Sequence, residues 1–235
     1  MTTRLACVLL LTSLFACGGD DNNNTPMPDA PGSAAQMITI TGTTKVVSAS
    51  GSNPLAGVTV GAYQNSDENT AVATATSDTA GVFTLTVATN GHPLDGYIKS
   101  SVPSYLDTYL YPPSAITADY SGAAINIVNE STLEALSTIC GHGITNSQGV
   151  IGVEVFDAAM MPVGGAVISS TPAAMKYCYN GSSPLPDSSK TMTSADGIGY
   201  MIDLTGDVMV SATKAGATFA THTVKVRTNA LTTTL

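Results

Sequence analysis

A motif of turn residues and alternating apolar residues occurs twice in this sequence, about one hundred residues apart. The first copy, residues 54–85, opens with P-L-A-G-V-T-V-G-A-Y and closes with T-S-D-T-A-G-V-F-T-L. The second copy, residues 162–204, opens with P-V-G-G-A-V-I and closes with T-S-A-D-G-I-G-Y-M-I-D-L. Because solenoid repeats are much shorter than this spacing, the motif predicts a duplicated small domain.

The composition favours β structure throughout. Charged residues make up only 11% of the 235 residues, whereas Thr, Ser, Ala and Val are abundant, as in strands with one exposed face. We expect an all-β fold of two tandem small antiparallel β-sandwiches, over residues 37–128 and 149–235. Residues 129–148 would form a linker with a short helix. The net charge of −9 argues against nucleic acid as a partner, because phosphate binding needs clustered Lys and Arg.

Apolar residues alternate in the expected strands, which places Ile38 with Ile40, and Ile151 with Val153, on one face each. Polar turns separate these strands, so we expect consecutive antiparallel hairpins. Asp196 precedes Gly197 and predicts a tight hairpin turn. Residues 177–190, rich in Ser, Pro and Gly, read as an inserted loop.

The strings P-L-A-G-V-T-V, T-S-D-T-A-G-V-F-T-L and G-Y-I-K-S together resemble carboxypeptidase regulatory-like, transthyretin-like domains, including their Cna B-type relatives. The resemblance covers residues 37–112 and 149–235, and it implies a small antiparallel β-sandwich rather than an activity. Some Cna B-type relatives cross-link a Lys to an Asn or Asp. Lys45 lies near the first strand, but no inner Glu and no partner Asn are evident, so we expect no such bond.

The first sixteen residues are typical of a secretory signal, because Arg4 precedes an apolar run too short to span a bilayer. The run ends in Leu14-Phe15-Ala16-Cys17, which resembles the lipobox of bacterial lipoproteins, although Phe15 is bulkier than usual. This resemblance implies removal of residues 1–16, acylation of Cys17 and anchoring to the cell envelope through the lipid, in the outer membrane of a bacterium. The alternative is an ordinary cleaved signal with an incidental Cys.

Residues 17–36 contain almost nothing to bury and several prolines, so we expect a disordered tether. In the linker, Ser131 and Glu134 have the spacing of a capping box, which predicts a helix over residues 132–140.

Two cysteines, Cys140 and Cys178, remain in the exported chain once Cys7 leaves with the signal and Cys17 is acylated. A disulfide between them is the economical interpretation, and two separate thiols are the alternative.

Catalytic motifs are missing from the sequence: it contains no G-x-S-x-G, H-E-x-x-H, G-x-G-x-x-G or P-loop string. The histidines, His92, His142 and His222, have no second ligand at metal-binding spacing, so we expect no metal and no cofactor. We interpret Asp78, Asp157 and Asp196 as turn-forming residues, with a calcium site at any of them as the lesser alternative. A hydrolase would require His92 or His142 beside an acid in a cleft.

Recognition-type residues concentrate in one stretch, and they are Tyr97, Tyr105, Asp107, Tyr109 and Tyr111. Tyrosine rings can stack on sugars while a carboxylate accepts hydrogens from the sugar hydroxyls, so these residues are a candidate glycan site. The alternative is that the tyrosines fill a sheet edge and core, which the lack of Trp in the chain favours. The leading hypothesis is a non-catalytic, lipid-anchored scaffold or interaction module whose partner is an unknown envelope protein. A carbohydrate-binding surface lipoprotein is the alternative.

Overall fold

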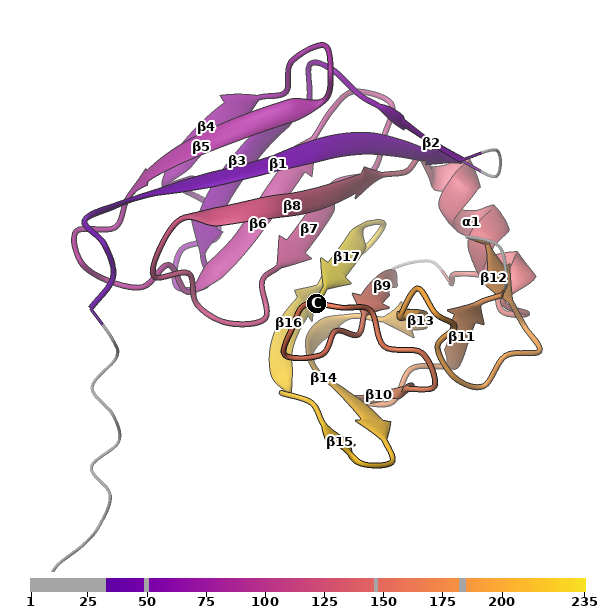
Figure 1. Ribbon diagram of the computed structural model, residues 1–235. Helices are drawn as coiled ribbons and strands as arrows, with labels where there is room; N and C mark the ends of the chain where they lie inside the picture. Colours follow the sequence, from indigo (N-terminus) through magenta and orange to yellow (C-terminus); the bar gives the residue numbers. More distant parts are fainter. Residues whose placement is uncertain (1–32, 49–50, 146–147, 182–184) are drawn as a thin grey trace, which may run out of the picture. The chain divides into compact units, whose positions relative to one another are not determined.

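The computed structural model describes residues 33–48, 51–145, 148–181 and 185–235, which form three β-sheets and a short helix (Figure 1). The first outer sheet contains β1 (Met37–Ser48), β2 (Gly51–Pro54), β5 (Val82–Ala88) and β8 (Tyr120–Ile127). The second outer sheet contains β10 (Val167–Thr171), β14 (Gly206–Lys214), β15 (Ala217–Thr218) and β16 (His222–Val226).

The third sheet, here called the central sheet, has nine strands within the described residues, in the order β12-β11-β13-β9-β17-β7-β6-β3-β4. Its first half consists of β3 (Thr59–Gln64), β4 (Ala73–Thr76), β6 (Gly96–Ser101) and β7 (Thr108–Tyr111). Its second half consists of β9 (Gly149–Glu154), β11 (Lys176–Asn180), β12 (Pro186–Asp187) and β13 (Ile198–Leu204). Strand β17 (Leu231–Thr234) lies between the halves and pairs with both.

The expected all-β architecture is confirmed, but the pairing is mixed rather than purely antiparallel. Strand β8 runs parallel to β1, and β17 runs parallel to both β7 and β9. These three pairs join strands that are not consecutive in the chain, whereas the consecutive pairs β1–β2 and β3–β4 are antiparallel as expected. Alternation of apolar residues determines which face of a strand is buried, and it does not determine which strand becomes its neighbour.

The two halves of the central sheet bury opposite faces. In the first half, Ile98 and Leu110 pack against Ile40 and Leu85 of the first outer sheet, in the first core. Thr232 pairs with Tyr109 on one side and with Ile151 on the other, so these three side chains lie on the same face of the sheet. Leu110, the neighbour of Tyr109, lies on the opposite face, in the first core. Ile151 packs against the second outer sheet in the second core, so the two cores lie on opposite faces of the central sheet. Each half therefore has one face in a sandwich core and one face covered by other means.

The sequence repeat corresponds to the same hydrogen-bonded corner in both copies. In the first copy, the N–H of Thr44 donates to the carbonyl of Gly81 (2.8 Å), and the N–H of Leu55 donates to the carbonyl of Thr44 (3.0 Å). The corresponding residues of the second copy are Val155, Gly197 and Val163. A Cβ on Gly81 would lie 2.5 Å from the carbonyl oxygen of Thr44, and φ is +74° there, so the corner requires glycine.

A buried hydroxyl closes each corner. Ser77 Oγ accepts the N–H of Val58 (3.0 Å), and Thr193 Oγ1 accepts the N–H of Ala166 (2.9 Å). Each hydroxyl also donates to a carbonyl at the start of its repeat. The two copies of the motif therefore agree at the positions that form these hydrogen bonds, namely the corner glycine and the buried hydroxyl.

Helix α1 (Glu130–Ile139) occupies the linker; it begins two residues earlier and ends one residue earlier than expected. Asn129 is its N-cap and accepts the N–H of Thr132 (2.8 Å), whereas Ser131 donates its hydroxyl to Asn129 (3.0 Å). The predicted capping box at Ser131 and Glu134 is therefore wrong. Asn and Ser are comparable caps, and the Asn two residues upstream takes the role here.

Two loop predictions also need correction. The end of the predicted tether packs on the first sandwich, since Ala34 is buried and its N–H donates to the carbonyl of Gly91 (3.1 Å). The predicted loop over residues 177–190 instead contains most of β11 and all of β12. The predicted signal, Cys17 and most of the tether lie outside the described residues. No helix within those residues has the length and apolar content needed to cross a membrane.

Candidate functional site

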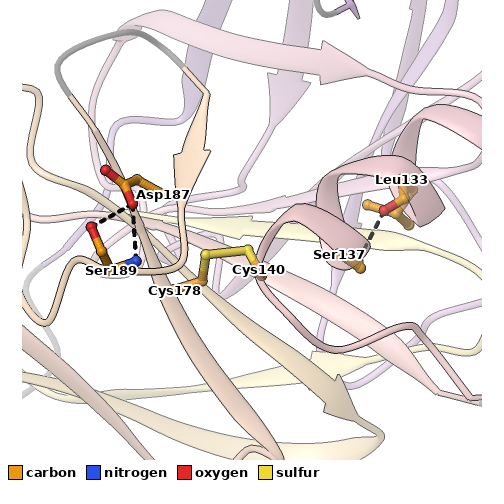
Figure 2. Close-up of a disulfide and its surroundings, with 6 residues drawn as sticks. All are labelled: Leu133, Ser137, Cys140, Cys178, Asp187 and Ser189. Atoms are coloured by element: carbon orange, nitrogen blue, oxygen red, sulfur yellow. Dashed lines mark hydrogen bonds between the residues drawn. A yellow bond between two sulfur atoms is a disulfide. The ribbon is translucent and has the colours of Figure 1, made fainter.

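A disulfide joins α1 to the second half of the central sheet, as expected (Figure 2). Cys140 at the end of α1 and Cys178 in β11 have Cα atoms 5.6 Å apart, and both side chains are 1% exposed. Leu133 of α1 packs with them. The helix is thereby fixed on the face of the second half that points away from the second core.

The predicted recognition tyrosines are mostly interior. Tyr97, Tyr109 and Tyr111 are 2%, 7% and 4% exposed, and the ring of Tyr97 stacks on Tyr63 at 5.5 Å between centroids. Their rings cannot stack on a sugar while they are packed in this way, so the structure contradicts a glycan site made of these three residues. Filling of the sheet face, which was the alternative, describes them correctly.

The remaining two recognition candidates, Tyr105 and Asp107, are only partly buried. Tyr105 packs against the edge of the first core. Asp107 is already engaged by Lys99, whose Nζ lies 2.8 Å from Oδ2. The structure therefore does not bring the five predicted residues together into one exposed surface.

Arg227 covers the tyrosine cluster, defined as Tyr63, Tyr97, Tyr109 and Tyr111. Its guanidinium carbon lies 4.7 Å from the ring centroid of Tyr97 and 4.0 Å from that of Tyr109. The guanidinium also donates to the Tyr111 hydroxyl (3.2 Å). Burial raises the pKa of Tyr97 to about 12, so its phenol keeps its proton at physiological pH. Arg227 follows β16, and it therefore ties the second sandwich to the first half of the central sheet.

Glu68 completes this contact from the first sandwich. It accepts from Arg227 Nη2 (2.9 Å) and from Lys225 Nζ (2.6 Å). The hydrogen bond from Lys225 is the largest cause of the lowered pKa of Glu68. Sequence reasoning missed both Glu68 and Arg227, because the residues lie 159 positions apart and no local pattern links them.

His142 does have an acidic neighbour, although no sequence spacing indicated it. Its Nε2 lies 3.1 Å from Oδ2 of Asp203. The same carboxylate accepts two hydrogen bonds from Thr145: Oδ1 accepts the backbone N–H (2.8 Å), and Oδ2 accepts the hydroxyl. Burial opposes ionisation of Asp203, but these hydrogen bonds hold its pKa below the ordinary value. No Ser or Cys side chain of the described residues bonds to His142, so the group fastens a loop to β13.

The other predicted chemistry is structural as well. Asp78, Asp157 and Asp196 each accept backbone N–H groups of their own turns, which is the turn-forming role expected of them. His92 lies exposed in its turn. Within the described residues, no group of three or more His, Cys, Asp or Glu side chains could hold a metal ion.

A cavity of about 330 Å³ lies beside α1, on the face of the second half that α1 does not fully cover. One wall is the outward face of β8, with Tyr120, Ala124 and Asn126. Leu133 and Leu136 of α1 form a second wall. The floor is the central sheet, with Gly152, Glu154, Tyr200 and Thr233, and Leu235 follows β17 at its edge.

The cavity contains a charged group that the fold does not use. Glu154 is half-buried at the end of β9, and no hydrogen bond or ion pair engages its carboxylate within the described residues. Burial raises its pKa, and the charge of Asp196 raises it further. On the same face, burial raises the pKa of Tyr200 to about 12, so the phenol keeps its proton. The cavity thus offers apolar walls, one carboxyl group and one hydroxyl group.

Sequence reasoning gave no indication of this cavity. Glu154 sits in V-I-G-V-E-V, where it reads as an ordinary exposed strand residue. Tyr200 reads in the same way within G-Y-M-I-D-L. Only the pairing of β13 with β9 and the position of β8 bring these side chains under a common cover.

Comparisons with known proteins identify no family. No family model matches the sequence, and no curated protein matches it. The similar solved structures include the Bacillus anthracis TIE protein (12% identity, TM-score 0.25), which covers 84% of this chain; the chain spans 33% of the length of that protein.

Two pilins are similar at the same level. The minor pilin GBS52 of Streptococcus agalactiae has 11% identity and a TM-score of 0.26, covering 84% of this chain and 94% of its own. The shaft pilin of Lactobacillus rhamnosus GG has 14% identity and a TM-score of 0.24, covering 85% and 96%. Similarity at this level establishes neither a family nor a function for this chain.

Proposed function

We propose that this protein is a non-catalytic, lipid-anchored component of a bacterial cell envelope that serves as a scaffold or interaction module. The observation that carries the proposal is the central sheet, in which β17 pairs in parallel with both β7 and β9. Two sandwiches that share one sheet cannot rotate about a flexible linker. A body of this kind suits a protein that holds other molecules at a fixed geometry.

The distribution of charged and reactive groups supports the same proposal. Glu68, Arg227 and Lys225 are paired across the two sandwiches, and His142 is paired with Asp203. Within the described residues, the hydroxyl bonded to a histidine ring is that of Thr234, on Nε2 of His222, and no carboxylate bonds to that ring. These charged side chains hold parts of the fold together.

Envelope anchoring rests on the sequence. Leu14-Phe15-Ala16-Cys17 resembles a lipobox, and residues 18–32 are polar or small enough to act as a spacer between lipid and body. Two or three acyl chains on Cys17 would hold the protein on a membrane, since each buried methylene contributes about 0.8 kcal/mol.

Metabolic labelling with a palmitate analogue tests the anchor. The wild-type chain should incorporate the label and sediment with membranes, whereas the Cys17→Ala variant should remain unlabelled and be recovered in the soluble exported fraction. A Cys140→Ala variant is the matched control, because it retains the lipobox and should be labelled. A wild-type chain that carries no label would overturn the anchoring.

The scaffold role is tested by capture of partners from envelope extract. Lipidated wild-type protein and the Cys17→Ala variant should retain the same partner protein, because we assign binding to the folded body. Retention that requires the lipid, or retention of nothing by either chain, would contradict this role.

A further inference from the structure

We propose that the cavity beside α1 binds a small amphipathic cation, an organic ammonium with an aliphatic or aromatic body, whose ammonium group pairs with the carboxylate of Glu154. This inference goes beyond the scaffold function and does not depend on the lipid anchor. It rests on the cavity, on the unpaired carboxylate and on the charge of the surrounding side chains.

The walls determine the apolar part of the ligand. Leu133 and Leu136 from α1, Ala124 from β8 and Leu235 from beyond β17 present hydrocarbon to the cavity. A volume of about 330 Å³ falls at the lower end of the range for small-molecule sites. An unbranched chain of moderate length or one aromatic ring system fits this space better than a large ligand.

Glu154 determines the polar part of the ligand. Half-buried carboxylates normally have a cationic or hydrogen-bonding partner, because an unpaired charge is expensive to remove from water. Another carboxylate of the second half, that of Asp203, does have a partner in His142. A ligand that brought an ammonium group to Glu154 would supply the missing partner and would be held by a charge-assisted hydrogen bond.

The sign of the ligand charge follows from the other groups around the cavity. Glu154 is the charged residue of the lining, and no Lys, Arg or His lines the cavity within the described residues. Asp196 lies close enough to raise the pKa of Glu154 through its charge, so it adds to the negative potential. The net charge of −9 acts in the same direction. An anionic amphiphile such as a fatty acid would be repelled.

Gly152 provides a way to fill the cavity from its floor. A Cβ at this position would meet only Thr233 Cγ2, at the ordinary contact distance of 3.7 Å. Gly152→Phe therefore introduces a Cβ that meets no backbone atom, and its ring is intended to occupy the space that the ligand needs. Ala124, on the exposed face of β8, offers the same opportunity from the opposite wall.

The test uses N-phenyl-1-naphthylamine, an uncharged dye that fluoresces in apolar sites, with the full chain carrying Cys17→Ala so that no acyl chain competes. Octylammonium, octanol and octanoate serve as competitors of equal chain length. We expect dye fluorescence to rise on binding and octylammonium to displace the dye at a concentration about tenfold below that of octanoate. A protein that gives no fluorescence increase, or that octanoate displaces equally well, would overturn the proposal.

Three variants connect the result to the site. Glu154→Gln should bind the dye but lose the preference for octylammonium over octanol, whereas Glu134→Gln, exposed on α1, should keep it. Gly152→Phe should abolish dye binding. If circular dichroism shows that Gly152→Phe does not fold, Ala124→Trp replaces it, because it fills the cavity from the opposite wall and should abolish dye binding as well. An unchanged preference in Glu154→Gln, or wild-type dye binding in a folded cavity-filling variant, would contradict the assignment.

Discussion

Each half of the central sheet has one face outside its own sandwich core, and the two faces are covered in different ways. On the first half, the tyrosine cluster fills the face, and Arg227 closes it with bonds to Tyr111 and Glu68. On the second half, α1 and the disulfide cover one end, while a cavity remains over Glu154 at the other. The tyrosine face is thus filled by side chains, and Arg227 and Glu68 on it are paired. The cavity face is partly open, and its carboxylate, that of Glu154, has no partner among the described residues.

The difference indicates which face serves stability and which is available for binding. Buried charges that stabilise a fold are paired and hydrogen-bonded, as Arg227 is with Glu68. Glu154 contributes no such bond, and its burial opposes its ionisation. We therefore expect substitutions on the tyrosine face to destabilise the protein, whereas substitutions on the cavity face should leave its stability unchanged or raise it.

The largest effect should come from breaking the strand that joins the two halves. Thr232 is fully buried and lies between Tyr109 and Ile151, so Thr232→Pro removes a backbone N–H from the ladder and leaves a buried carbonyl unpaired. We expect a loss of about 3 kcal/mol or more in urea unfolding followed by circular dichroism. The control is Thr218→Pro in the edge strand β15. Equal destabilisation by the two variants would show that β17 does not join the halves.

Removing the disulfide should have the next largest effect. The bond closes a separation of 38 residues, for which the chain-entropy model gives about 4 kcal/mol, with about 2–4 kcal/mol typical in practice. The Cys140→Ser, Cys178→Ser double variant should therefore unfold about 5–15 °C lower in a thermal scan. Reductant should lower the midpoint of the wild type and leave the double variant unchanged. A wild type that is insensitive to reductant would argue against the covalent attachment of α1.

Replacing Arg227 tests the paired face directly. Arg227→Met keeps the apolar stem but removes the cation over Tyr97 and Tyr109 and leaves Glu68 with Lys225 alone. We expect a loss of about 2 kcal/mol in chemical unfolding. Lys214→Met, on an exposed strand end, should stay within about 0.5 kcal/mol of the wild type. If the two variants are equally stable, the paired face is not the stabilising one.

Replacing Glu154 should have the smallest effect and the opposite sign. Burial raises its pKa in the folded state, so the native protein binds more protons than the unfolded chain and loses stability as the pH rises from about 4.5 through the folded pKa. Glu154→Gln stays neutral and should melt higher than the wild type at pH 7, by no more than about 2–4 °C, with the difference vanishing below pH 4. Glu134→Gln should show no such pH-dependent gain. A Glu154→Gln variant that melts lower at every pH would mean that the carboxylate stabilises the fold.

The sequence predicted the elements that depend on local pattern. Turn glycines such as Gly81 and Gly197 were recognisable because their corners need a positive φ and leave no room for a Cβ. Cys140 and Cys178 could be paired because the exported chain contains few cysteines. The burial of Ile38 and Ile40 followed from alternation alone.

The elements that depend on contacts far apart in the chain were not predictable. The parallel pairing of β17 with β7 joins residues more than one hundred positions apart, and no periodicity encodes it. Tyr97 and Tyr109 read as recognition residues because the sequence does not reveal that Arg227 packs over them. Glu154 was not singled out, because the sequence of β9 does not reveal that β8 and α1 lie over its side chain.

Amide hydrogen exchange at increasing urea, followed by mass spectrometry of peptides from each sandwich, tests most directly whether the two sandwiches form one body. The most protected amides of β1 and β5 should open with the same free energy and the same urea dependence as those of β9 and β13, because both halves of the central sheet unfold together. Peptides from β1 and β5 that stay protected at a urea concentration where β9 and β13 have exchanged would contradict the account.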